Sequence, residues 1–184
     1  MFRIFGRLSA KLASIPYAVV GLFARCVVAY PFFMSGQSKV DGTKYGIDLL
    51  GQELSVKLPQ TMLDKTFELF ANDYKLPVIP SNIAAYIVAF TENVLPVLLL
   101  IGLATRLSAL GLFIMVLVIQ LFVFPGHWWT EHAYWLALLL LLMSRGPGAI
   151  SLDAFFGLFR RKPKAPRPAP PSAAPDVITP AVKV

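Results

Sequence analysis

The chain has 184 residues, of which 57% are hydrophobic and only 15% are charged. A soluble domain has roughly 45–50% apolar and about 25% charged residues, so this composition disfavours a soluble protein. The apolar residues also gather in long runs, which is typical of a membrane protein in contact with the lipid bilayer. The net charge is +7, and residues 160–184 carry six Lys or Arg against one acidic residue. Charge gathered at one end indicates membrane topology, and no nucleic-acid partner is expected.

Cys26 is the single cysteine of the chain. One thiol excludes an internal disulfide and a Cys-x-x-Cys relay, which disfavours a membrane dithiol oxidase. Its apolar neighbours predict a small, buried hydrophobic side chain.

Four apolar runs follow one another along the chain, at residues 15–34, 83–103, 107–124 and 130–144. A helix crosses the hydrocarbon core with about 20 residues, and about 17 suffice, so the fourth run is marginal. The alternative for the first run is a signal peptide, which a charged residue within it and the lack of a small-residue cleavage site disfavour. The predicted fold class is all-α, a polytopic membrane four-helix bundle.

Three domains are predicted from these runs: a basic N-terminus (1–14), a transmembrane domain (15–159) and a basic, Pro/Ala-rich disordered tail (160–184). Lys and Arg precede the first run, stand between the second and third, and follow the fourth, whereas the turn between the third and fourth has none. The positive-inside rule then places both termini in the cytoplasm.

The long segment between the first two runs is predicted to face outward and to contain an amphipathic helix. Leu63, Phe67, Phe70 and Tyr74 follow one another at spacings of three and four, which favours a helix lying on the outer membrane face. After the fourth run, Gly146-Pro147-Gly148 is expected to end the helix. Ser151 is expected to cap a short helix whose positive N-terminal end suits Asp153.

Two opposite charges lie inside the apolar runs. Arg25 is ten residues beyond the start of the first run, about 15 Å deep, and Glu92 is eleven residues before the end of the second, about 17 Å deep. An unpaired charge there costs at least roughly 2.5–3.5 kcal/mol. Because the two runs are antiparallel, the matched depths predict an intramembrane Arg25–Glu92 ion pair. The pair is either a structural staple or part of a pocket for a quinone headgroup, an anion or a proton.

Other polar residues are candidates for a pocket or an interface: Lys39, Asp41, Asn93 and Arg106. Interfacial solvation is the favoured explanation of Lys39 and Asp41, with attraction of an anion by Lys39 as the alternative, and membrane topology alone explains Arg106. No metal site is expected, because the weak candidates His127, Glu131 and His132 follow no recognised ligand spacing. The tryptophans near them are predicted to form an aromatic belt.

Several of these residues form a recognisable set. Phe32, Gly36 and Lys39 fit F-x-x-x-G-x-x-K, GLATR follows Glu92 at residues 102–106, and GPGAISLD occupies residues 146–153. Together with Arg25, this order resembles the DoxX family over about residues 15–156. The resemblance implies a four-helix bundle in the bacterial cytoplasmic (inner) membrane. It also implies an association with membrane redox systems, such as thiosulfate:quinone oxidoreductases and complexes of oxidative or thiol stress, but gives no agreed catalytic residues.

Two functions follow as hypotheses. The first is a membrane subunit of a redox or oxidative/thiol-stress system that works with a membrane or soluble redox partner protein, with a quinone as the candidate cofactor. The second is a non-enzymatic membrane scaffold or small-solute pathway, in which the intramembrane charges are structural. The sequence leaves open whether the chain is an enzyme and assigns no catalytic residue.

Overall fold

We analysed a computed structural model, which describes residues 2–49, 51–74, 76–77 and 79–157. The predicted tail at residues 160–184 lies outside these residues. The elements are, in chain order, α1 (Phe2–Ala13), α2 (Tyr17–Lys39), β1 (Val40–Leu49), β2 (Gln52–Met62), α3 (Asp64–Asn72), α4 (Ser81–Ile101), α5 (Thr105–Val118), η1 (Ile119–Val123), η2 (Pro125–His127), η3 (Trp128–His132), α6 (Ala133–Arg145) and α7 (Leu152–Phe155).

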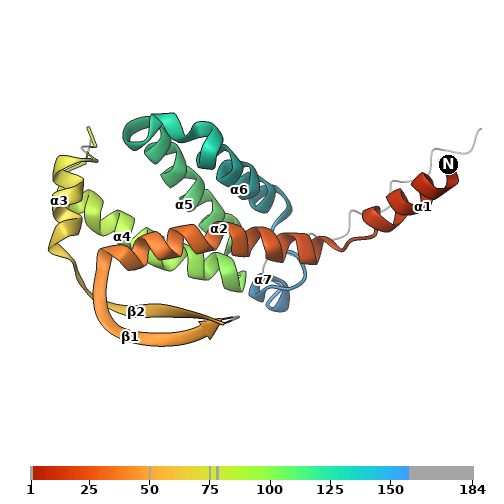
Figure 1. The fold of residues 1–184 in the computed structure, drawn as a ribbon, viewed down its shortest axis with the longest axis horizontal. Coiled ribbons are helices and arrows are strands. Elements are labelled where there is room, and N and C mark those ends of the chain that lie inside the picture. The colour runs from red at the N-terminus through yellow and green to blue at the C-terminus, as the bar shows by residue number, and fades with distance from the viewer. Residues whose placement is uncertain (1, 50, 75, 78, 158–184) are drawn as a thin grey trace, which may run out of the picture.

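Helices α2, α4, α5 and α6 pack together, with α3 at one end and α7 at the other (Figure 1). We refer to these as the α3 end and the α7 end. The core between the helices is aliphatic, and Val28, Leu99, Leu112, Val116 and Leu139 are completely buried in it. Small residues on α2 and α4, among them Ala29, Ala85 and Ala89, are also buried, and small residues let two membrane helices approach closely.

Three helical stretches in the described part of the chain are long and apolar enough to cross a membrane: Tyr17–Lys39, Ser81–Ile101 and Thr105–Val123. The last combines α5 with the π-helical η1. The fourth predicted run forms η3 and the 13-residue α6, which is not among these stretches. A fourth crossing therefore stays a prediction.

The all-α fold class is wrong for the segment after α2, where β1 and β2 form an antiparallel hairpin that pairs Val40 with Met62 and Leu49 with Gln52. The chain alternates polar and apolar residues here, notably in ELSVKL, and this period of two is typical of strands. This alternation predicts strands, but the prediction of an all-α fold rested only on apolar runs and helical spacings.

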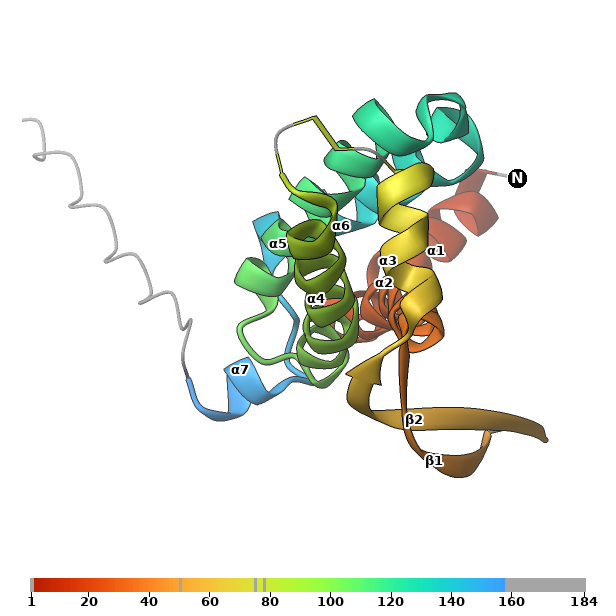
Figure 2. The same cartoon turned by 90° about the vertical axis from the view of Figure 1, so that its left-hand side faces the viewer.

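Helix α3 falls within the predicted amphipathic segment and packs on α4 (Figure 2). Phe70 is buried against Ala84 and Ala85, and the Phe67 ring lies 5.3 Å from that of Tyr86. The Thr66 hydroxyl donates to the Lys39 carbonyl oxygen at 3.0 Å, which fixes α3 to the end of α2.

At the α7 end, Arg25 holds the C-terminus of α4. Gly102 ends that helix in the left-handed conformation, at φ 73°, and the Leu103 amide donates to the Leu98 carbonyl at 2.9 Å. The Arg25 guanidinium donates to the Leu100 carbonyl at 2.9 Å and to that of Ile150. A cation beside carbonyls that have no helical partner is stabilising both as a donor and through the helix dipole.

Asp153 performs the reciprocal task for α5. Its two carboxylate oxygens accept from the amides of Ala104 and Thr105 at 2.8 and 2.9 Å, so it caps α5 from the far end of the chain. The predicted cap of α7 is confirmed, because the Ser151 hydroxyl accepts from the Ala154 amide. Asp153 lies in the first turn of α7, as expected from the sequence, and its contact with α5 was not predicted because the two segments are far apart in the chain.

Replacing Arg25 with Gln is expected to destabilise the fold, because the carbonyls of Leu100 and Ile150 lose charged hydrogen-bond donors, at a cost of about 1–3 kcal/mol. The measurement is the thermal unfolding midpoint of the purified protein in detergent. Arg145→Gln is the matched control, because Arg145 is exposed and lies 5.8 Å over the Tyr17 ring. Equal midpoints for the two variants would contradict the capping role of Arg25.

Candidate functional site

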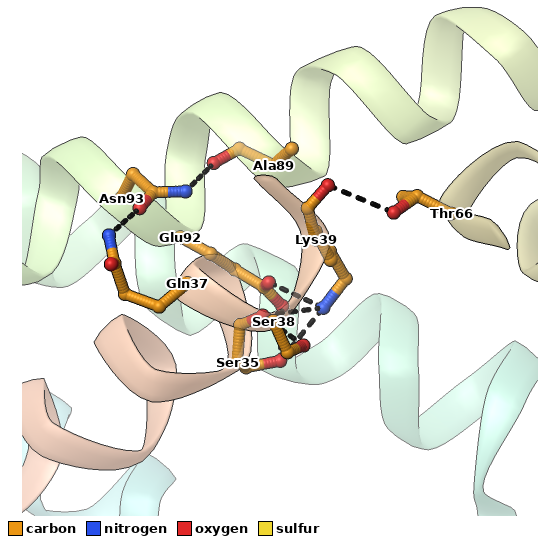
Figure 3. A network of polar contacts seen from close by, with 8 residues as sticks. All are labelled: Ser35, Gln37, Ser38, Lys39, Thr66, Ala89, Glu92 and Asn93. Carbon is orange, nitrogen blue, oxygen red and sulfur yellow. Dashed lines mark hydrogen bonds and ion pairs between the residues drawn. The ribbon is translucent and has the colours of Figure 1, made fainter. Parts of the chain in front are cut away.

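A buried ion pair joins the end of α2 to the middle of α4 (Figure 3). The Lys39 Nζ lies 2.6 Å from the Glu92 Oε2, and the two side chains are only 7% and 5% exposed. The ammonium also donates to the hydroxyl and the carbonyl oxygen of Ser35, at 2.8 and 3.3 Å. The Ser35 hydroxyl donates in turn to the Glu92 Oε1 at 3.3 Å. The pair is therefore well supplied with partners, as a buried charge requires.

The predicted Arg25–Glu92 ion pair is wrong. The Arg25 guanidinium is engaged with carbonyls at the α7 end, whereas Glu92 binds Lys39 toward the α3 end. The depths were counted from the ends of the apolar runs, as if α2 and α4 ended level. In the structure Gly36 of α2 lies against Glu92 and Asn93 in the middle of α4, and the Arg25 guanidinium reaches the last turn of α4, so the N-terminal turns of α2 extend beyond α4. The segment around Pro147 covers this extension, and its carbonyl oxygen would lie 2.9 Å from a Cβ on Gly21.

Gly36 permits the close contact of α2 and α4 beside the ion pair. A Cβ at this position would lie 2.8 Å from the Glu92 carbonyl carbon and 2.7 Å from the Asn93 Nδ2. The glycine of the F-x-x-x-G-x-x-K pattern thus brings the helices together one turn before the lysine that reaches across.

Hydrogen bonds extend from this contact to the hairpin. The Gln37 Nε2 donates to the Asn93 Oδ1 at 2.7 Å, and the Asn93 Nδ2 donates to the Ala89 carbonyl at 2.8 Å (Figure 3). The Gln37 Oε1 accepts from the Lys57 amide in β2 at 2.6 Å. The ion pair and its neighbours therefore connect α2, α4, the hairpin and α3.

A cavity of about 170 Å³ lies beside the ion pair, between α2, α3, α4, η1 and the start of α6. Lys39, Glu92 and Ser35 form part of its wall. Much of the remaining wall is aromatic: seven rings follow one another with centroids 5.1–6.1 Å apart, namely Phe70, Tyr74, Phe124, His127, His132, Trp135 and Phe32. All of these except His127 line the cavity. The site thus joins a compact polar group to a set of aromatic faces and edges.

Tyr74 and His132 add polar atoms to the aromatic wall. Burial raises the pKa of Tyr74, and the charges of Glu92 and Asp73 act in the same direction, so its phenol keeps its proton at neutral pH. The His132 Nδ1 lies 2.5 Å from the Gln120 Oε1, which fixes the orientation of the imidazole.

The other predicted site residues lie at several places. Asp41 is exposed on the hairpin, and Asn93 adjoins the ion pair without lining the 170 Å³ cavity. Arg106 is at the α7 end, where it and Arg145 line a separate hollow of about 640 Å³. Of the weak metal candidates, Glu131 and His132 line the aromatic cavity and His127 stacks beside it. In the part of the chain that the structure describes, no three His, Cys, Asp or Glu side chains come together as a metal site.

Sequence reasoning did not identify Ser35, Tyr74 and Trp135 as members of this site. Ser35 stands four residues before Lys39 on one helix face, a spacing that could have revealed their contact. Trp135 was assigned to an aromatic belt, but it packs against Phe32 and His132 in the cavity wall. Cys26, expected to be buried, is exposed on the outside of α2.

Apolar helices that surround a buried ion pair and an aromatic cavity define the class of this chain as a small polytopic membrane protein. A model of the DoxX family matches residues 20–125, more than half of the sequence, and the chain belongs to that family. The match covers α2, the hairpin, α3, α4 and α5, and thereby the Lys39–Glu92 pair. The comparisons with curated proteins and with solved structures found no match.

Gly36→Ala is expected to separate α2 from α4 and to destabilise the protein by about 1–3 kcal/mol, because the added methyl group meets the α4 backbone. Gly6→Ala is the control, since a Cβ at Gly6 in α1 meets nothing within 4 Å. Alanine has the better helix propensity, so the control should be neutral or slightly stabilising. Thermal midpoints in detergent provide the measurement, and a neutral Gly36→Ala would argue against the close contact.

A double-mutant cycle is expected to reveal strong coupling between Lys39 and Glu92. Lys39→Met or Glu92→Leu alone leaves one buried charge without its partner, at a cost of about 3–5 kcal/mol, whereas the double variant removes both charges. The double variant should therefore be more stable than either single variant in thermal or denaturant unfolding. Additive losses would show that the two charges do not act as a pair.

Proposed function

We propose that this DoxX-family chain is the membrane subunit of a quinone-linked redox system, and that the aromatic cavity beside Lys39 and Glu92 receives the quinone ring. The observation that carries the proposal is the combination of a polar wall and an aromatic wall in one small cavity. Ligand sites are mostly apolar with a few polar groups that fix orientation. A quinone ring has this composition, with two flat apolar faces and two carbonyl oxygens.

The size of the cavity supports a single ring. Its volume of about 170 Å³ is close to the roughly 150 Å³ of an engineered protein cavity that binds benzene. The Lys39 ammonium and the Tyr74 phenol are donors suited to the ring carbonyls, and Trp135 and Phe32 supply aromatic surfaces for it.

The reaction supported by these groups is reduction of the quinone to the quinol, which takes up two electrons and two protons. A partner redox protein would supply the electrons, because the chain's one cysteine offers no dithiol. Glu92 and Lys39 are the groups suited to exchanging protons with the ring oxygens, and Ser35 connects them.

The proposal includes the membrane arrangement. The fourth crossing is made by η3 and α6, residues 15–159 form one transmembrane domain, and both termini are in the cytoplasm of a bacterium, at its inner membrane. Supporting this arrangement, Arg106 and Arg145 lie together at the α7 end, where positive charge is retained on the cytoplasmic side. The hairpin and α3 then face outward.

One observation favours a different function, a scaffold without redox chemistry. The Lys39–Glu92 pair is well bonded within the bundle, and the Lys39 carbonyl also holds Thr66 of α3. In a scaffold, the only role of the pair would be to fix the register of α2 against α4. The two functions differ in whether the cavity holds a ligand.

Purification of the full chain in a mild detergent, followed by extraction and quantification of quinones, is expected to recover a bound quinone and a co-purifying redox protein. Lys39→Met and Glu92→Gln should lose the quinone, because each removes a polar group of the cavity wall. Lys44→Met and Glu68→Gln are the controls, at exposed positions of the hairpin and of α3. A wild-type protein that retains no quinone and binds none when it is added would favour the scaffold.

A further inference from the structure

A second hollow, of about 250 Å³, lies between α4 and α5, which pack against each other. Ala84, Val88 and Thr91 line it from α4, and Gly111, Met115 and Val118 line it from α5. Each set repeats at three and four residues, so each occupies one face of its helix over about 10 Å. We call this hollow the α4–α5 groove.

The α4–α5 groove lies on the outer surface of the packed helices. Ile87 and Ile114, which stand on its two sides, are 52% and 53% exposed. Both helices are candidate membrane spans, so the exposed side of the groove meets lipid hydrocarbon. An apolar groove in this position is suited to a hydrocarbon chain.

The α4–α5 groove adjoins the aromatic cavity. Leu76, Val88, Met115 and Val118 line both hollows and form the wall between them. This wall consists of aliphatic side chains and the unbranched side chain of Met115, whose three rotatable bonds allow it to change position at little cost. A ligand that occupied both hollows would pass between Val88 of α4 and Met115 of α5.

The sizes of the two hollows indicate which part of such a ligand each one would hold. The aromatic cavity has room for one ring and its polar substituents but not for a long chain, whereas the groove offers an apolar path into the lipid. We propose that the α4–α5 groove binds the hydrocarbon tail of a ring-bearing lipid and is the lateral entrance to the aromatic cavity. The inference rests on the proposed quinone function and adds to it that the substrate is a tailed, membrane-dissolved quinone.

The test compares two probes with the same substituted ring, decylubiquinone and the tailless 2,3-dimethoxy-5-methyl-1,4-benzoquinone, on the full chain in lipid nanodiscs. Binding is followed by quenching of the intrinsic tryptophan fluorescence, to which Trp135 in the cavity wall contributes. Ile87→Phe and Ile114→Phe enlarge exposed side chains at the groove, so the fold is retained. Leu107→Phe is the control, at a position on α5 that is more exposed and does not line the groove.

The two groove variants are expected to weaken decylubiquinone binding about tenfold by filling the space for the tail. Binding of the tailless ring should stay at the wild-type level in both variants, and Leu107→Phe should change neither probe. If the two groove variants bound decylubiquinone as the wild type does, or lost both probes equally, the assignment of the tail to the groove would be wrong. The proposed ring site would not be affected by either result. A wild-type chain that bound neither probe would overturn the proposed function, and the inference with it.

Discussion

The buried contact between Lys39 and Glu92 sets the arrangement of the α3 end. Each charge is buried and would be left without a partner if the other were removed, so the pair favours one register of α2 against α4. The same lysine is the last residue of α2, and its backbone carbonyl receives the hydroxyl of Thr66 from α3. The ion pair therefore determines helix register, positions the outer elements and supplies the polar wall of the aromatic cavity.

The two ends of the bundle use buried charge differently. At the α7 end, Arg25 and Asp153 are directed at the backbone, where they satisfy the end of α4 and the beginning of α5. Arg25 and Asp153 bond to backbone carbonyls and amides that have no partner within their own helices, so their role is to stabilise the helix ends. At the α3 end, Glu92 and Lys39 bind side chains and adjoin an aromatic cavity. Basic and acidic side chains thus bind the backbone at one end and line a cavity at the other.

The sequence was sufficient to predict the elements that depend on local pattern. The apolar runs correspond to α2, α4, α5 with η1, and α6, and the predicted cap of α7 by Ser151 is present. It could not predict the offset of α2 against α4, because the offset depends on Gly36 meeting the α4 backbone and on the chain around Pro147 covering the start of α2. Once the offset is known, Lys39 rather than Arg25 is the partner of Glu92. Pairing by counted depth failed because helices in a bundle need not end level.

The offset also explains where a ligand site can form. Because α4 extends beyond α2 at the α3 end, α3 packs on α4 there, and aromatic side chains of α3, η3 and α6 enclose a space that α2 does not fill. One wall of that space separates it from the lipid-facing α4–α5 groove, and the exposed residue Glu131 lies on another. A ring held there would be reachable from the membrane through its tail, while its oxygens lay near groups that exchange protons with water. The register of α2 and α4 at the ion pair thus accompanies a cavity with a polar and an aromatic wall at the α3 end.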